Sequence, residues 1–118
     1  MSGVELRDAP MFVPSSEVIA GSQLTDFARF CERATQRTFA DDRDFARFTV
    51  DEYERFWSLF LEWSNLAVSG DATQVCAKPS DVERAVFFPE LRLSYFDSLL
   101  DERVAPADAV AVVACHAS

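Results

Sequence analysis

Near its end the chain carries an uninterrupted apolar run at residues 109–115, with the sequence AVAVVAC. Apolar and polar residues do not alternate in it, which is typical of a strand covered on both faces in a parallel or mixed sheet. The chain shows no second strand signal of comparable strength, and a lone strand leaves its backbone amides without partners. We therefore expect this run to be the first strand of a larger α/β core that continues in further polypeptide. Two alternatives are a short helix of alanine and valine, and a strand that pairs with a neighbouring molecule.

A second pattern precedes this run, with the sequence FFPELRLSYFDSLL at residues 87–100. Its first three residues predict a corner, because proline fixes its own φ and restricts the residue before it. Ser94 then occupies the position of a helix N-cap, with Asp97 three residues later. Tyr95, Phe96, Leu99 and Leu100 give this helix an apolar side. The residues that we expect to form this structural motif are Phe87, Phe88, Pro89, Leu93, Ser94, Tyr95, Leu99 and Leu100.

The clearest helix signal lies in the middle of the chain, where Thr49 and Glu52 have the spacing of a capping box. It predicts a helix over residues 50–65 with large apolar side chains at helical spacing. We expect this helix to anchor the domain through the capping pair and three aromatic residues, namely Thr49, Glu52, Phe56, Trp57 and Phe60. The same aromatic face, extended by Trp63, is alternatively a partner-binding surface, since Trp and Phe are common in interface cores.

Weaker signals complete a mainly α chain. Ser22 as N-cap predicts a helix over 24–34, and one or two helical turns are expected within 39–48. The side chains that share the buried face of the first of these helices are Leu24, Phe27, Ala28, Cys31 and Ala34. Residues 69–71, with the sequence SGD, predict a turn. The expected division is a flexible tail at 1–9, a helical domain at 10–105, and a link with the first core strand at 106–118.

Composition excludes several classes of function. The chain has 11 Lys and Arg against 20 Asp and Glu, a net charge of −9, which argues against binding to nucleic acid. Its apolar runs are too short to span a membrane, and its first residues do not resemble a signal peptide, so a cytoplasmic location is expected. Cys31, Cys76 and Cys115 have no C-x-x-C spacing, which favours buried, reduced thiols over a zinc site or a disulfide framework.

No catalytic, cofactor-binding or metal-binding residue is predicted. The three glycines are far apart, so no loop can cradle a phosphate. His116 is the single histidine, near the chain end and without a partner at ligand spacing. Asp41, Asp42 and Asp44 lack the central glycine and the terminal glutamate of a calcium loop and are interpreted as a solvated helix start. Lys78, in an acidic loop bounded by proline, is interpreted as simply exposed.

Taken in order, these motifs resemble the amino-terminal region of acetyl- and acetoacetyl-CoA synthetases, which are adenylate-forming, AMP-forming ligases. In that family a phrase such as FPGA-x-LNYAENLL precedes the first core strand, as FFPELRLSYFDSLL precedes AVAVVAC here. Upstream, MFVP at 11–14 and TVDEYERFW at 49–57 correspond to the family's tryptophan-proline opening and its SV-x-x-FW helix start.

The chain departs from this family pattern at single positions. Phe12 stands where a tryptophan is usual and Glu90 where a glycine is usual. Ser94 and Ser98 stand where asparagines are usual. These differences bear on the subfamily and on the acid substrate more than on the fold.

The resemblance implies a helical amino-terminal segment that leads into a larger α/β adenylate-forming core and packs on it. The parent ligase would activate a short-chain or 3-oxo acid with ATP and Mg²⁺, then transfer it to CoA or to the phosphopantetheine thiol of a carrier protein. In the family, the residues for this chemistry lie beyond the first core strand. The implied partners are the catalytic core and a carrier protein, with no nucleic acid and no membrane. The alternatives are a free-standing acidic helical docking module and an unrelated acidic helical protein.

Overall fold

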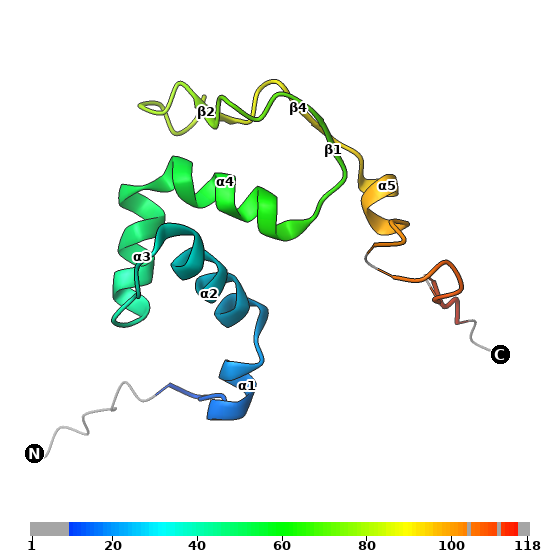
Figure 1. The fold of residues 1–118 in the computed structure, drawn as a ribbon, viewed down its shortest axis with the longest axis horizontal. Coiled ribbons are helices and arrows are strands. Elements are labelled where there is room, and N and C mark those ends of the chain that lie inside the picture. The colour runs from blue at the N-terminus through cyan, green and yellow to red at the C-terminus, as the bar shows by residue number, and fades with distance from the viewer. Residues whose placement is uncertain (1–9, 104, 111, 116–118) are drawn as a thin grey trace, which may run out of the picture. The chain divides into compact units, whose positions relative to one another are not determined.

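The computed structural model describes residues 10–103, 105–110 and 112–115 (Figure 1). Of the described residues, 43% are helical and 10% lie in strands, which confirms a mainly α chain. The chain divides into two compact units, Met1–Arg37 and Thr38–Ser118. The predicted tail at 1–9 lies outside the described residues, and the predicted boundaries at 105 and 106 stay predictions.

The first unit contains α1 (Ser16–Ala20) and α2 (Gln23–Thr35). Ser22 caps α2, because its hydroxyl accepts a hydrogen bond from the backbone nitrogen of Thr25 at 3.2 Å. The predicted N-cap is therefore confirmed. At the other end Gln36 adopts the left-handed conformation, with φ of 54°, that commonly terminates a helix.

The predicted apolar face of α2 is only partly buried. Phe27 and Cys31, one turn apart, are buried as expected. Leu24 and Ala34 are exposed, so the prediction was wrong for both residues. They lie at the two ends of the helix, and burial is confined to its middle turns.

The second unit begins with α3 (Asp42–Asp51) and α4 (Tyr53–Ser64), which are separated by one non-helical residue, Glu52. The predicted capping box was wrong, because Thr49 lies inside α3 and not before a helix. Its hydroxyl donates a hydrogen bond to the carbonyl of Ala46 at 2.8 Å, as threonine hydroxyls often do within helices.

The reason for this difference is the early start of α3, which is longer than the one or two turns predicted. Asp41 is its N-cap, and the Asp41 carboxylate accepts a hydrogen bond from the backbone nitrogen of Asp44 at 2.8 Å. The helix then runs through Thr49. Glu52 occupies the N-cap position of α4 without a side-chain cap, and its carboxylate lies 3.7 Å from Arg55.

An aromatic cluster joins α3 to α4. Phe48, in α3, is buried with 4% of its surface exposed. Its ring centroid lies 5.3 Å from that of Phe39, 6.3 Å from Phe45 and 6.4 Å from Phe56 of α4. Leu59, one turn further along α4, is also buried. These contacts hold the two helices together across the break at Glu52.

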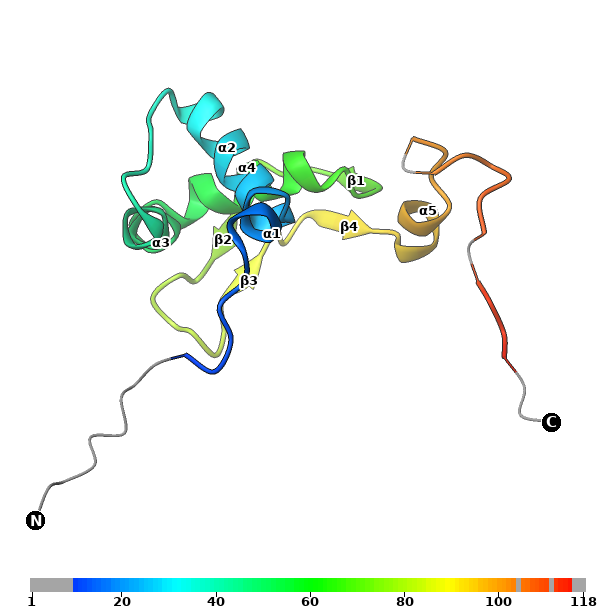
Figure 2. The same ribbon diagram turned by 90° about the horizontal axis from the view of Figure 1, so that it is seen from below.

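Two antiparallel ribbons follow: β1 (Val68–Gly70) with β4 (Leu91–Leu93), and β2 (Cys76–Ala77) with β3 (Val86–Phe87) (Figure 2). The predicted turn at 69–71 was wrong, because Gly70 ends a strand opposite Leu91. Its φ of 101° and the closeness of the Glu90 carbonyl explain why glycine stands there.

The predicted helix after Ser94 is confirmed as α5 (Tyr95–Leu99), which directly follows β4 (Figure 1), a strand that was not predicted. The predicted strand at 109–115 is not formed: residues 109–110 and 112–115 have no regular secondary structure, and 111 is not described. Val112 and Val113 have 80% and 75% of their surface exposed. No strand of the described residues pairs with this run, and an unpaired strand is not stable in water.

Candidate functional site

The predicted corner joins the two ribbons. Phe88 follows β3 with a positive φ of 49°, and its backbone nitrogen donates a hydrogen bond to the carbonyl of Val75 at 2.8 Å. The Leu91 nitrogen then donates to the Phe88 carbonyl at 3.0 Å, which closes a four-residue turn. Pro89 occupies the second position of this turn, where its fixed φ is favourable. The corner therefore sets the direction of β4.

Aromatic rings connect the corner to the predicted helix anchor. The Phe87 ring lies 5.5 Å from Trp57 and 6.5 Å from Tyr53, both in α4. Trp57 in turn contacts Phe56 at 5.2 Å and Phe60 at 5.6 Å, measured between ring centroids. The structure thus brings Phe87 of the predicted motif against Trp57 of the predicted helix anchor. Tyr95 of the motif is exposed instead, and Thr49 and Glu52 do not cap α4.

Hydrogen bonds from two serines fix the start of α5. Ser94 is its N-cap, as predicted, and accepts a hydrogen bond from the backbone nitrogen of Asp97 at 3.2 Å. The Ser94 nitrogen donates to the Ala67 carbonyl at 3.0 Å, which extends the β1–β4 ribbon by one bond. The Ser98 hydroxyl accepts from the Ala67 nitrogen at 2.9 Å and donates to the Ser94 carbonyl at 2.7 Å. This role of Ser98 could not be predicted from local sequence, because its partner Ala67 is 31 residues away.

Replacing Ser98 by alanine is expected to lower the free energy of unfolding by about 1–2 kcal/mol, because the half-buried Ala67 amide loses its partner. Ser58→Ala is the matched control, since that hydroxyl bonds only within its own helix and is exposed. Urea denaturation followed by circular dichroism measures both variants. Equal midpoints for the two variants would contradict a structural role for Ser98.

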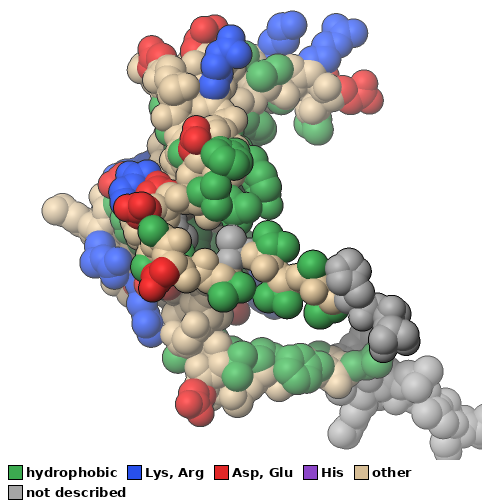
Figure 3. Space-filling model, turned by 90° about the vertical axis from the view of Figure 1, so that its right-hand side faces the viewer, with side chains coloured by type: hydrophobic (Ala, Val, Ile, Leu, Met, Phe, Trp, Pro, Cys, Tyr) green, Lys and Arg blue, Asp and Glu red, His purple; other side chains and the backbone are tan. Residues whose placement is uncertain are grey.

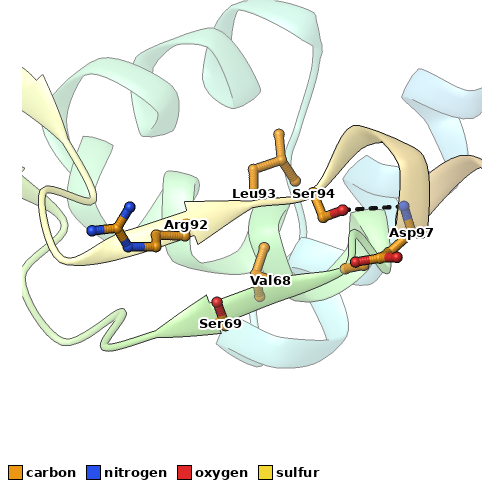
Figure 4. Close-up of a pocket in the computed structure, with 7 residues that line it drawn as sticks. Val68, Ser69, Arg92, Leu93, Ser94 and Asp97 are labelled. Carbon is orange, nitrogen blue, oxygen red and sulfur yellow. Dashed lines mark hydrogen bonds between the residues drawn. The ribbon is translucent and has the colours of Figure 1, made fainter.

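A small hollow of about 170 Å³ lies where the β1–β4 ribbon meets α5 (Figure 4). It is smaller than typical ligand pockets of about 300–1,000 Å³. Its polar groups include one cation, Arg92, and one carboxylate, Asp97, and it has no nucleophile paired with a base. The residues that line it are Ala67, Val68, Ser69, Arg92, Leu93, Ser94 and Asp97. This geometry does not support acid activation at the hollow.

The apolar side of α5 faces away from the contacts that hold the helix. Tyr95 has 77% of its surface exposed and Phe96 69%. Leu99 and Leu100 are also exposed, as is Leu93 in β4. A large loss of stability in Tyr95→Ala, which would require a buried ring, is therefore not expected. Figure 3 shows hydrophobic side chains exposed on the face of the molecule that it draws.

Among the described residues, the other candidate groups are not arranged as a metal-binding site. Cys31 and Cys76 are buried, as predicted, whereas Cys115 is exposed, so the prediction was wrong for Cys115. Burial raises the pKa of the Cys31 thiol to about 11, which keeps it protonated and unreactive at neutral pH. Among the residues that the structure describes, no three His, Cys, Asp or Glu side chains are grouped to hold a metal ion. His116 lies outside these residues, and Lys78 is exposed.

One ion pair follows α5. The Arg103 side chain donates hydrogen bonds from Nε to both carboxylate oxygens of Asp101, at 2.9 and 2.8 Å. These bonds hold the pKa of Asp101 at about 2. A lowered pKa means that the pair stabilises this segment above pH of about 4 and that the effect is lost between about 4 and 2.

Arg103→Ala is expected to raise the pKa of Asp101 toward its ordinary value of about 3.9. The pKa of Asp101 is measured from its carboxyl carbon chemical shift by nuclear magnetic resonance. The titration runs from about pH 1.5 to about pH 6, which spans about two units on either side of the ordinary pKa. Glu102→Ala is the control, because it removes an adjacent charge and leaves the pair intact. A titration of Asp101 that is the same in all three proteins would contradict the assigned pairing.

Comparison with known proteins agrees with the resemblance in the sequence. The chain is 31% identical to acetoacetyl-coenzyme A synthetase from Rhizobium meliloti (strain 1021) over 94 residues, which are 79% of this chain and 14% of that protein. It is 32% identical to acetoacetyl-CoA synthetase from Caenorhabditis elegans over 80 residues, 67% of this chain and 11% of that protein. The similarity is distant and lies in the amino-terminal region of these synthetases.

Other comparisons do not extend this finding. No protein-family model matches the chain, and no solved structure matches it significantly. The matched region is a small part of each synthetase, which is several times longer. Among the residues described, no helix is both long and apolar enough to cross a membrane.

Proposed function

We propose that this chain is the amino-terminal segment of an ATP-dependent, AMP-forming acid-thiol ligase that resembles acetoacetyl-CoA synthetase. The parent enzyme adenylates a short-chain or 3-oxo acid and transfers it to CoA or to the phosphopantetheine thiol of a carrier protein. The segment packs on the catalytic core and is not catalytic by itself. The single observation that carries this proposal is the similarity over 79% of the chain to one part of a much longer synthetase.

The structural role is supported by where the ordered contacts lie. The aromatic anchor of α4, the corner at Phe88 and the capped start of α5 form one connected set through Phe87 and Ser94. The apolar side chains that follow, in α5 and in residues 109–110 and 112–115, are exposed. A segment that is ordered on one side and apolar on the other is suited to packing on a second body.

ATP, Mg²⁺ and CoA do not fit the residues described here. Neither a ligand cluster for Mg²⁺ nor a glycine-rich phosphate loop is present among them. The hollow beside α5 is too small for a nucleotide. Binding of these groups is therefore assigned to the remainder of the parent enzyme, and a cytoplasmic location stays a prediction.

A second candidate is a free-standing acidic docking module, which the net charge of −9 and the exposed apolar side chains favour. Such a module would associate with a basic partner, and the association would weaken as salt concentration rises.

The length of the encoding reading frame distinguishes the two candidates. If the chain belongs to a ligase, the reading frame should continue for several hundred codons and encode a Ser/Thr/Gly-rich loop that ends in lysine. A stop codon soon after Ser118 would contradict it and favour the docking module.

A further inference from the structure

Five exposed apolar side chains of the second unit lie close together in the sequence, on β4 and at α5. We call this surface the β4–α5 face, and its residues are Leu93, Tyr95, Phe96, Leu99 and Leu100, each at least half exposed. Val68, the register partner of Leu93 in β1, is also exposed and lies on the same side of the ribbon. In α5, Phe96 is spaced three and four residues from Leu99 and Leu100, so these three side chains share one side of the helix.

This face requires a partner on physical grounds. Contiguous apolar surface of this kind marks an interaction site more often than free solvent-facing surface. A helix of five residues such as α5 does not persist on its own propensity. Ser94 and Ser98 hold it on one side through hydrogen bonds with Ala67. Within the part of the chain that the structure describes, no such hydrogen bonds hold the opposite, apolar side.

We infer that the β4–α5 face docks on the apolar surface of the ligase's α/β core, beside the sheet that takes up residues 109–115. This inference rests on the proposed function. Residues 101–108 form the link between Leu100 and the run at 109–115. Leu100 and Ala109 are nine residue steps apart, which span at most about 30 Å when fully extended, so the body that covers the start of this run lies within about that distance of α5.

A second copy of the chain fits this face less well than the core does. Each copy carries a net charge of −9, so two copies repel one another. The synthetases that match this chain are several times longer than the matched part, so they contain a large further body. The core is therefore the occupant that both the charge and the lengths favour.

The test uses a chimera in which this chain replaces the matching residues of the Rhizobium meliloti acetoacetyl-CoA synthetase. Hydrogen–deuterium exchange compares amides 93–100 in the chimera and in the chain alone. We expect protection in the chimera to rise by about tenfold or more, because docking suppresses local opening. Phe96→Ser should lower the thermal midpoint of the chimera and leave that of the chain alone unchanged. Val82→Ser, at an exposed valine outside this face, should change neither.

The outcomes separate the two proposals. An active chimera in which amides 93–100 exchange as fast as in the chain alone would overturn the docking face and leave the proposed function standing. A chimera without synthetase activity that is also unfolded would overturn both. A concentration-dependent dimer of the chain alone that Phe96→Ser abolishes, measured by sedimentation, would assign the face to a second copy and overturn the inference.

Discussion

Replacing Gly70 by alanine is expected to break the β1–β4 ribbon and to lower the free energy of unfolding by about 3 kcal/mol or more. Two effects add at this position. The φ of 101° is strained for any residue with a Cβ atom, and a Cβ placed there would overlap the carbonyl oxygen of Glu90. That oxygen cannot move freely, because it accepts a hydrogen bond from the Asp71 nitrogen at 3.2 Å. The ribbon must therefore open to accommodate the methyl group.

Gly21→Ala is the matched control for this prediction. Gly21 has a negative φ, and a Cβ there would lie 3.5 Å from the Glu17 carbonyl oxygen, an ordinary contact. Urea denaturation midpoints should fall for Gly70→Ala and stay nearly unchanged for Gly21→Ala. A midpoint for Gly70→Ala within experimental error of the wild type would show that β1 and β4 do not pair as described.

Phe48→Ala is expected to cost about 3–5 kcal/mol, the usual range for removing a buried aromatic side chain. Phe48 is 4% exposed and its ring contacts Phe39, Phe45 and Phe56, so its loss leaves a cavity between α3 and α4. Small domains are stable by only about 5–15 kcal/mol, so this variant should be close to unfolding at 37 °C. Thermal unfolding followed by circular dichroism measures the effect.

Val50→Ala, two residues away in the same helix, serves as the control because 72% of the Val50 surface is exposed. It should change stability by no more than about 0.5 kcal/mol. If Phe48→Ala and Val50→Ala unfolded at the same temperature, the aromatic cluster would not be the core of the second unit.

Sequence reasoning succeeded where the signal is local. Ser22 and Ser94 cap helices as predicted, because a capping hydroxyl acts on backbone nitrogens only two or three residues away. It failed for Thr49 and Glu52, whose spacing fits a capping box equally well. The reason is that α3 already begins after its N-cap, Asp41, and runs through Thr49, so Thr49 is an interior helix residue and not an N-cap.

Long-range pairings were beyond sequence reasoning. The sequence around Gly70 predicts a turn, because a glycine in a turn cannot be distinguished in the sequence from one that allows the close approach of Glu90, twenty residues later. The role of Ser98 is equally non-local, because its hydroxyl reaches the Ala67 nitrogen only when β1 and β4 are paired. The candidate motif at residues 87–100 could be located from the sequence, whereas its outward-facing apolar side could not.

The apolar run at 109–115 has the sequence pattern of a buried strand, but no strand of the described structure pairs with it. Its periodicity predicts a strand, yet Val112 and Val113 remain exposed. A strand forms only when another strand accepts its hydrogen bonds, so pattern alone does not determine the conformation of this run.

Acid-dependent exchange of pyrophosphate into ATP tests the proposed function most directly. The full gene product should catalyse this exchange with a short-chain or 3-oxo acid, whereas residues 1–118 alone should not. Exchange catalysed by residues 1–118 alone would contradict the assignment of the chemistry to the remainder of the enzyme. A full gene product that folds but supports no exchange with any short acid would contradict the assignment of this chain to an acid-thiol ligase.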